Sequence, residues 1–410
     1  MEPASPSTPA PPGTGPADHP VSWDVAIVGG GPAGISTALH LHAAAPRARI
    51  VVLEKARYPR DKICAGGIGA RAFRLLERIG VEVACPRVAL DAVAIRLPGA
   101  AAPELVVIDQ PGCGAVVRRI EFDHAFARHA IDRGIAVRDG CAVHAIAAGE
   151  RGATVTTDEG ALEARCVVGA DGVAGVVRRL AGFPRGALRA QVVELDTEAA
   201  PGDLPRDTIV FDFAAGDLRG YAWDFPTLVA GEPQVCRGVY ALGVADRPRD
   251  RLAAYLAGRG LDIARYRVKQ FAERGFEPGA EIARPRVLLV GEAAGIDIAT
   301  GEGIGQAIEY GSIAGGYLAQ ALARDDLGFA DWRRTVEKHH LGWQLAIRHG
   351  CYRAFYGRRR PQIERLMPRL TALLRLGVQD FAGAPLSKLA MARGAAQFLA
   401  AITKHKMGRA

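Results

Sequence analysis

Two spacings of apolar residues alternate along the first part of the 410-residue chain. Residues 23–28 form a short apolar run, and residues 50–53 form a second one that ends on Glu54. Short apolar runs bounded by turn residues are typical of buried parallel strands. The segment between them turns at glycine and is rich in alanine and leucine through about residue 45, which predicts a helix. The chain therefore begins with an expected β-strand, α-helix, β-strand unit.

Glycines fill the turn between the first expected strand and the helix. Gly29, Gly31 and Gly34 give the spacing G-x-G-x-x-G, and Glu54 follows the last of them by 20 residues. In this context the first glycine permits a tight turn, the second lets a pyrophosphate approach the backbone, and the third lets helix and strand pack closely. The helix N-terminus offers free N–H groups to phosphate. We expect a dinucleotide site in which Glu54, with Lys55 beside it, reaches the ribose.

Further along the chain the pattern changes twice. Residues 192–242 hold short alternating segments, which predict an antiparallel sheet. A buried strand returns at residues 287–290 and leads into a helix over about residues 303–323. We expect an α/β fold in which an antiparallel substrate domain is inserted into a Rossmann-type domain. The expected boundaries are 1–20 for a proline-rich tail, 21–185 with 281–330 for the nucleotide-binding domain, 186–280 for the inserted domain and 331–410 for a helical C-terminal region.

The basic residues are concentrated near the C-terminus. The net charge is +8, but residues 331–410 hold 16 Lys and Arg against 4 Asp and Glu, whereas residues 1–330 hold 36 against 40. A basic, partly apolar region is typical of attachment to an anionic membrane surface or of an anionic substrate site. A solvated helical face explains the charge equally well. No nucleic-acid-binding motif accompanies it, so we expect no nucleic acid partner.

Several other classes of protein are disfavoured. No run of 18 predominantly apolar residues could span a membrane, and the first twenty residues lack the basic start and apolar core of a signal peptide. The seven cysteines include no C-x-x-C pair, which disfavours a structural metal site or a disulfide framework. We therefore expect a cytoplasmic protein without a metal, which could lie at the inner face of a membrane.

Three groups of motifs, in order, resemble a known set of flavoproteins. Residues 29–34 (GGGPAG), residues 169–173 (GADGV), and residues 291–295 (GEAAG) with 300–304 (TGEGI) are similar to the FAD-contacting motifs of the p-hydroxybenzoate hydroxylase-like superfamily. Residues 119–123 (RIEFD) resemble its arginine-bearing helix start. The resemblance implies a Rossmann-type FAD-binding domain and FAD as the cofactor. The implied FAD contacts are Gly29, Gly31, Gly34, Glu54, Lys55, Arg119, Asp171, Glu292, Gly303 and Ile304.

Two further segments resemble the geranylgeranyl reductase family within that superfamily. They are residues 58–67 (YPRDKICAGG) and residues 220–226 (GYAWDFP). Because side chains alternate along a strand, Tyr221, Trp223 and Phe225 are expected on one face. An aromatic wall would suit an isoprenoid chain, which offers apolar area and few hydrogen bonds. The alternative is that the three rings are ordinary sheet core, where aromatic residues usually lie.

Cys64 is the candidate catalytic residue. It follows Lys62 and precedes two glycines, and in the matched motif it could lie at the flavin, where a thiol can donate a proton or hold an alkene. A lone cysteine is otherwise more often structural. Other positions depart from the family pattern: Glu292 replaces the usual aspartate, Ile298 replaces a proline, which predicts a less rigid loop, and only Gly238 or Gly243 represents an expected glycine pair.

The resemblance implies an FAD-dependent oxidoreductase that reduces carbon–carbon double bonds of an isoprenoid lipid or diphosphate. Two alternatives remain open: an FAD-dependent monooxygenase or halogenase on the same fold, and a non-catalytic prenyl-binding protein. Only one dinucleotide fingerprint is present, so NADPH would bind transiently near the flavin, or a ferredoxin or quinol would donate the electrons.

Overall fold

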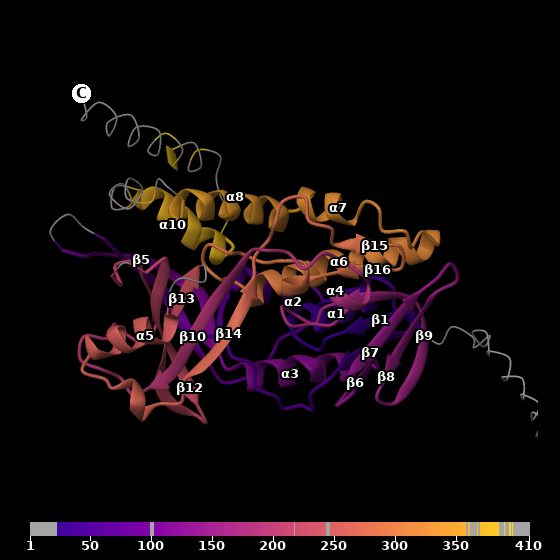
Figure 1. Cartoon of the computed structure of the whole chain (residues 1–410), viewed down its shortest axis with the longest axis horizontal. Helices are drawn as coiled ribbons and strands as arrows, with labels where there is room; N and C mark the ends of the chain where they lie inside the picture. The colour runs from indigo at the N-terminus through magenta and orange to yellow at the C-terminus, as the bar shows by residue number, and fades with distance from the viewer. Residues whose placement is uncertain are drawn as a thin grey trace, which may run out of the picture.

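The computed structural model describes residues 23–98, 102–216, 218–242, 247–357 and 370–384, with single positions at 360, 367, 389, 393, 394 and 396. The expected proline-rich tail and much of the basic C-terminal region lie outside the described residues. Two eight-stranded sheets make up most of the described fold. They occupy opposite ends of the long axis in Figure 1.

The first sheet contains the expected nucleotide-binding unit. Its strands run in the order β15-β16-β9-β1-β2-β6, and the β7–β8 hairpin joins it at β9. All neighbours on this path pair in parallel except β15 and β16. The strands are β1 (Trp23–Val28), β2 (Ile50–Glu54), β6 (Ala136–Asp139), β7 (Val143–Ala148), β8 (Ala153–Thr157), β9 (Gly160–Gly169), β15 (Ala283–Arg284) and β16 (Val287–Leu289). The βαβ prediction is confirmed, because α1 (Pro32–Ala44) connects the parallel strands β1 and β2.

The second sheet is predominantly antiparallel. Its order is β14-β10-β13-β12-β11-β4-β5-β3, and only β4 and β11 pair in parallel. Its strands are β3 (Gly67–Gly69), β4 (Arg87–Leu97), β5 (Glu104–Val117), β10 (Arg189–Thr197), β11 (Thr208–Asp212), β12 (Gly220–Val229), β13 (Glu232–Leu242) and β14 (Lys269–Arg274). The sheet thus includes β3, β4 and β5, which lie in a part of the chain that the sequence analysis assigned to the nucleotide-binding domain. Because β11 pairs with β4, residues of the expected nucleotide-binding domain and of the expected inserted domain share one sheet. The exact domain boundaries stay a prediction.

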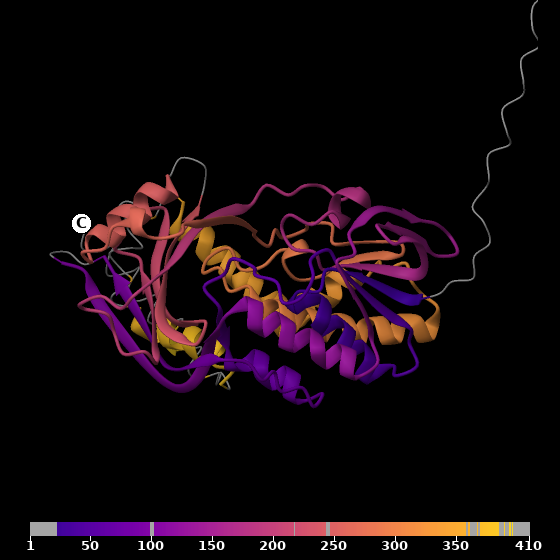
Figure 2. The same ribbon diagram turned by 90° about the horizontal axis from the view of Figure 1, so that it is seen from below.

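Helices pack on both sheets and bridge them. Beside α1 and the first sheet lie α3 (Arg119–Asp132) and α6 (Ile304–Arg324), both of which contact α1. The remaining helices are α2 (Ala70–Glu77), α4 (Val177–Leu180), α5 (Pro248–Ala257), α7 (Trp332–Lys338), α8 (His340–Phe355) and α10 (Thr371–Phe381), with short 3₁₀ turns at Ile263–Arg265 and Gly291–Ala293. In Figure 1, α7 and α8 run along one side of the molecule, and α10 lies beside α8. Figure 2 shows the same two ends from below.

The C-terminal helices cover one face of the second sheet. Tyr221, Trp223 and Phe225 belong to a buried cluster that also includes Tyr356, Met367 and Val378. A separate cluster covers the other face of that sheet, where α5 packs on β10 and β13. The aromatic face of β12 is therefore turned toward α8 and α10. This arrangement puts the described helices α8 and α10 over the aromatic strand.

Among the residues that the structure describes, no helix is both long and apolar enough to cross a bilayer. Within the same residues, no group of three or more His, Cys, Asp or Glu side chains is arranged to hold a metal ion.

Candidate functional site

A cavity of about 1360 Å³ runs from the end of β1 to the C-terminal helices. Its walls come from the parallel sheet, from β10, β12 and β14 of the second sheet, and from α8 and α10. Every candidate residue of the sequence analysis borders it except Gly34. The bordering candidates are Gly29, Gly31, Glu54, Lys55, Cys64, Arg119, Asp171, Tyr221, Trp223, Phe225, Glu292, Gly303 and Ile304. The structure thus brings distant parts of the sequence to one cavity.

The three glycines of the first motif have different surroundings. A Cβ atom at Gly34 would lie 1.9 Å from the carbonyl oxygen of Gly29, so Gly34 serves the packing of α1 on β1. Gly29 has a φ of 107°, which favours glycine. Gly31 differs from both, because the nearest atoms to a Cβ there are nitrogens of Arg60 and Arg119 at 3.8 and 3.9 Å. The space in front of Gly31 is open, and two guanidinium groups border it.

Those two guanidinium groups are held by a shared carboxylate. Arg119 is buried at the start of α3, and its Nε and Nη2 atoms each donate to Asp123 at 2.7 Å. Nη1 of Arg60 donates to the same side chain at 2.9 Å, and Nη2 of Arg60 lies 3.0 Å from Glu54. The two guanidinium groups are balanced by Asp123 and Glu54, but they lie beside the N-terminus of α1, whose N–H groups can receive the pyrophosphate of a dinucleotide. Arg60 was not among the predicted contacts, although it belongs to the motif that contains Cys64.

Glu54 lies at the end of β2, beside the glycine turn. Its Oε2 atom accepts a hydrogen bond from the Gly30 amide at 3.0 Å, and Oε1 accepts one from the Ala56 amide, also at 3.0 Å. The carboxylate is buried at the end of β2 and borders the cavity, whereas the adjacent Lys55 is exposed. This carboxylate is therefore fixed beside the glycine turn and borders the cavity.

Asp171 and Glu292 follow the neighbouring parallel strands β9 and β16. Oδ2 of Asp171 accepts from the Val177 amide at 2.8 Å, and burial raises the pKa of this carboxyl. Its Oδ1 atom is buried without a partner among the described residues. Glu292 forms an ion pair with Lys62 at 3.2 Å and accepts from the Arg274 amide at 3.3 Å. The carboxylate of Glu292 thus reaches the cavity despite its additional methylene.

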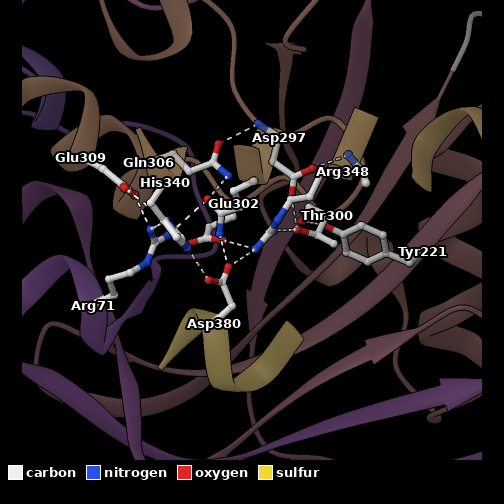
Figure 3. A network of polar contacts seen from close by, with 12 residues as sticks. Arg71, Tyr221, Asp297, Thr300, Glu302, Gln306, Glu309, His340, Arg348 and Asp380 are labelled. Carbon is white, nitrogen blue, oxygen red and sulfur yellow. Dashed lines mark hydrogen bonds and ion pairs between the residues drawn. The ribbon is translucent and has the colours of Figure 1, made fainter. Parts of the chain in front are cut away.

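The loop before α6 is held by an ion-pair network instead of by a proline (Figure 3). Arg348 of α8 donates to Thr300 Oγ1 at 2.8 Å and pairs with Asp297 at 2.5 Å and with Glu302 at 2.8 Å. The Asp297 amide donates to Gln306 at 2.8 Å. The expectation of a less rigid loop, drawn from Ile298, stays a prediction, but side chains of α6 and α8 hold the loop in the place of a proline.

The network continues across the C-terminal helices. His340 of α8 contacts Asp380 of α10 at 2.8 Å and Glu309 of α6 at 3.3 Å, while Arg71 of α2 pairs with Glu309 (Figure 3). Hydrogen bonds to Asp380 and then to Glu309 raise the pKa of His340 to about 9. The network ties four helices to the loop at residues 297–302.

The aromatic strand β12 forms a wall of the cavity. Tyr221, Trp223 and Phe225 are all buried and all border the cavity. The three rings are therefore part of the sheet core and at the same time form a cavity wall, so each alternative of the sequence analysis holds in part. The ring of Tyr221 stacks on Tyr240 with centroids 5.1 Å apart. A Cβ atom at Gly238 would lie 2.0 Å from the Trp223 ring, which explains a glycine after the aromatic signature. The other candidate, Gly243, lies outside the described residues.

Cys64 borders the same cavity and lies beside a carboxyl group that the sequence analysis missed. Its backbone amide donates to Oε1 of Glu194 at 3.0 Å. The thiol is half-buried, and desolvation raises its pKa. Glu273 of β14 is a second missed carboxyl at the cavity, with its pKa raised well above the usual value by burial. An acidic residue among inward-facing apolar residues of a strand was the available signal for both.

Comparisons with known proteins agree with this geometry. Residues 22–213 match the family described as an FAD binding domain. The chain is 29% identical over 346 residues to a digeranylgeranylglycerophospholipid reductase of Methanothrix thermoacetophila, covering 77% of this chain and 84% of the relative. It is 27% identical over 353 residues to a menaquinone reductase of Mycolicibacterium smegmatis, covering 79% and 83%.

Solved structures with low sequence identity share the fold. A geranylgeranyl bacteriochlorophyll reductase-like protein of Thermoplasma acidophilum superposes with a TM-score of 0.66 at 18% identity, over 94% of this chain and 98% of the other. The flavin-dependent brominase Bmp2 superposes with a TM-score of 0.71 at 17% identity, over 94% and 99%. The resemblance to geranylgeranyl reductases is thus confirmed, and, with an FAD-binding domain at residues 22–213 and reductases among its relatives, the chain is an FAD-dependent oxidoreductase.

Proposed function

We propose that the chain reduces carbon–carbon double bonds of an isoprenoid lipid or isoprenoid diphosphate. The observation that carries this proposal is the continuity of one cavity, which runs from the glycine turn past Cys64 to an aromatic and aliphatic wall. The wall offers rings from β12 and aliphatic residues from α10, and few charged groups. An elongated apolar substrate can bury its surface there, which supplies most of the binding energy for such ligands.

The cofactor would lie along the first part of the cavity. The pyrophosphate of FAD would bind at Gly31 between the N-terminus of α1 and the guanidinium groups of Arg60 and Arg119. Glu54 and Lys55 would reach the adenosine ribose. The remaining proposed contacts are Gly29, Gly34, Asp171, Glu292, Gly303 and Ile304. The open space at Gly31, the buried and unpartnered Oδ1 of Asp171 and the volume of the cavity support this placement.

Reduced FAD supplies a hydride when it is bound, and the protein supplies orientation, a dry environment and a proton. Tyr221, Trp223 and Phe225 would orient the isoprenoid chain and exclude water from it. Cys64 would contact the alkene at the point where the glycine-rich segment meets the aromatic wall. The hydroxyl of Tyr221 donates to the Thr300 carbonyl at 2.5 Å, which fixes this wall relative to the loop before α6.

A direct assay distinguishes this proposal from the runner-up. Purified protein reconstituted with FAD is reduced anaerobically and incubated with polyprenyl diphosphates or prenylated glycerolipids, and the products are analysed by mass spectrometry. A gain of two hydrogens per reduced bond supports the reductase. The fold likeness to the brominase Bmp2 favours a monooxygenase or halogenase as the second candidate. Oxygen consumption with substrate oxygenation or halogenation, and no saturated product, would support that candidate instead.

The electron donor and the membrane also belong to the proposal. NADPH would bind transiently near the flavin, because the chain carries one dinucleotide fingerprint. Trp343 and Ile347, one turn apart on α8, border the cavity and are each 45% exposed. Apolar side chains at a cavity mouth, beside a basic C-terminal region, favour peripheral attachment to an anionic membrane from which a lipid substrate could enter. The protein would then act at the inner, cytoplasmic face of that membrane.

A further inference from the structure

Glu194 occupies an unusual position for a charged residue. It lies in β10, its side chain borders the cavity, and only 1% of the residue is exposed. Its Oε1 atom accepts a hydrogen bond from the backbone amide of Cys64 at 3.0 Å. Its Oε2 atom is buried and has no hydrogen-bond partner among the described residues. A buried polar atom without a partner is uncommon and points to a role in binding or chemistry.

Nearby cations do not neutralise Glu194, because they are paired with another carboxylate. Asp196, two residues further on the same face of β10, pairs with Arg118 at 3.0 Å and with Lys269 at 3.0 Å. No ion pair to Glu194 is present among the described residues. The titratable groups that face it are Cys64, Arg118, Asp196, Cys236 and Lys269.

This environment favours the neutral acid. Desolvation is the largest contribution and raises the pKa of Glu194 to about 7, against a smaller opposing effect of Lys269. A carboxyl with such a pKa can hold and release a proton near neutral pH, where catalytic acids are most effective. The thiol of Cys64 is a weaker acid at the same place, because burial raises its own pKa above the usual range for cysteine.

We propose that Glu194 is the catalytic acid that protonates the alkene during reduction, an inference that rests on the proposed function. Reduced FAD, when bound, would supply the hydride for a C–H bond at one alkene carbon. The π electron pair forms the second C–H bond with the carboxyl proton of Glu194, whose O–H bond breaks. The carboxylate that remains takes a proton from water before the next turnover. Cys64 then keeps the other role considered for it, contact with the alkene, and its amide orients the acid.

The test uses the FAD-loaded enzyme in single-turnover reduction over a range of pH. In wild type, the rate should fall as the pH rises through about 7, because the acid loses its proton. Glu194→Gln should retain FAD, slow the reaction roughly a hundredfold or more, and abolish that pH dependence. Glu194→Asp should restore part of the rate. Glu232→Gln, at an exposed position at the start of β13, is the matched control and should behave as wild type.

A second measurement needs no substrate. The infrared difference spectrum between wild type and Glu194→Gln should contain the C=O stretch of one protonated carboxyl at pH 6, and this band should titrate with a midpoint near 7. Taking the difference removes the contribution of Glu273, whose pKa is also raised and which both proteins retain. A wild-type protein that reduces no isoprenoid would overturn the proposed function. An active wild type whose rate and pH profile are unchanged in Glu194→Gln would overturn the assignment of the acid, and so would a Glu194 that is ionised throughout the range from pH 5 to 8.

Discussion

The guanidinium group of Arg348 in α8 lies 2.8 Å from the carboxylate of Glu302, in the loop that leads into α6. Arg348 also pairs with Asp297, so one side chain holds both ends of that loop. Removing one member of a buried ionic network leaves its partners uncompensated, which costs roughly 3 to 5 kcal/mol. We expect Arg348→Met to lower thermal stability and to weaken FAD retention, measured by calorimetry and by flavin absorbance after gel filtration.

The exposed Arg334 of α7 provides the control for that experiment. Arg334→Met removes the same charge outside the network and should keep both stability and flavin. Equal behaviour of the two variants would mean that the network does not support the loop.

Gly31 tests the cofactor site. Gly31 has an extended backbone, with φ −81° and ψ −175°, and the nearest atoms to a Cβ there are 3.8 Å away. Valine should therefore fold at this position but block the approach of a pyrophosphate to the backbone. Gly31→Val is expected to purify as a folded, colourless protein. Gly149→Val, in an exposed turn with similar open space, should stay yellow. Full flavin occupancy in Gly31→Val would refute the proposed pyrophosphate site.

The substrate wall is tested by Trp223→Ala and Cys64→Ala. Both variants should keep FAD and lose most double-bond reduction, because the first opens the cavity wall and the second removes a contact to the alkene. Trp223→Ala should also lose roughly 3 to 5 kcal/mol of stability, as large aromatic truncations do. Phe126→Ala, in the buried core beside the parallel sheet, controls for that loss and should retain activity below its unfolding temperature. Unchanged turnover in Trp223→Ala and Cys64→Ala would leave those residues with a purely structural role.

His340 should make stability depend on alkaline pH. Its folded pKa is raised from 6.5 to about 9 by Asp380 and Glu309, so its charged form stabilises the folded state. That contribution is fully present below pH 6.5 and is lost as the pH rises through about 9. We expect the difference in unfolding temperature between wild type and His340→Gln to shrink over that range. The neighbouring, exposed His339→Gln serves as the reference, and a difference that is constant with pH would contradict the prediction.

Membrane attachment can be measured by flotation with liposomes. The full chain should float with vesicles that contain anionic lipid at low salt and much less at high salt, because screening shortens the reach of surface charge to about 10 Å at 0.1 M. Each basic residue near the surface contributes on the order of 1 kcal/mol. Arg358 and Arg359 lie outside the described residues, and Arg360 donates to the Leu218 carbonyl. Neutralising all three should therefore reduce flotation and also remove that contact.

An additional variant separates apolar from ionic attachment. Replacing Trp343 and Ile347 with serine removes the exposed apolar pair at the cavity mouth without changing charge. Flotation of this variant should be weaker at both salt concentrations. If no protein floats at low salt, the basic region is a solvated face or an anionic-substrate clamp.

The nucleotide-binding half of the fold was predictable because its signals are local. The run at residues 23–28, the glycine turn and Glu54 lie within one βαβ unit, and their spacing alone predicts how they meet. The membership of β4 and β5 in the second sheet was not predictable, since it depends on a parallel pairing between residues 92–96 and 208–212. Short-range periodicity carries no information on such a pairing.

The site shows the same division between local and distant information. The aromatic face of β12 followed from strand alternation, whereas the cover provided by α8 and α10 did not. Arg348 and Asp297 are 51 positions apart, and no spacing rule connects them. Glu194 was missed because a single carboxylate in a strand is usually assigned to the solvent face. Its signal in the sequence is its place among inward-facing apolar residues of β10, and the pairing of Asp196 with the local cations leaves it without an ion pair to any described residue.

Helix α8 contributes to three features of the molecule described above. Trp343 and Ile347 border the cavity and are exposed, His340 and Arg348 belong to the ionic network, and the network contacts the loop before α6. A displacement of α8 relative to α6 would therefore change the distances of the ion pairs that hold this loop. We therefore expect the entry of a bulky substrate beside α8 to be coupled to the order of the loop before α6, through the ion pairs of Arg348.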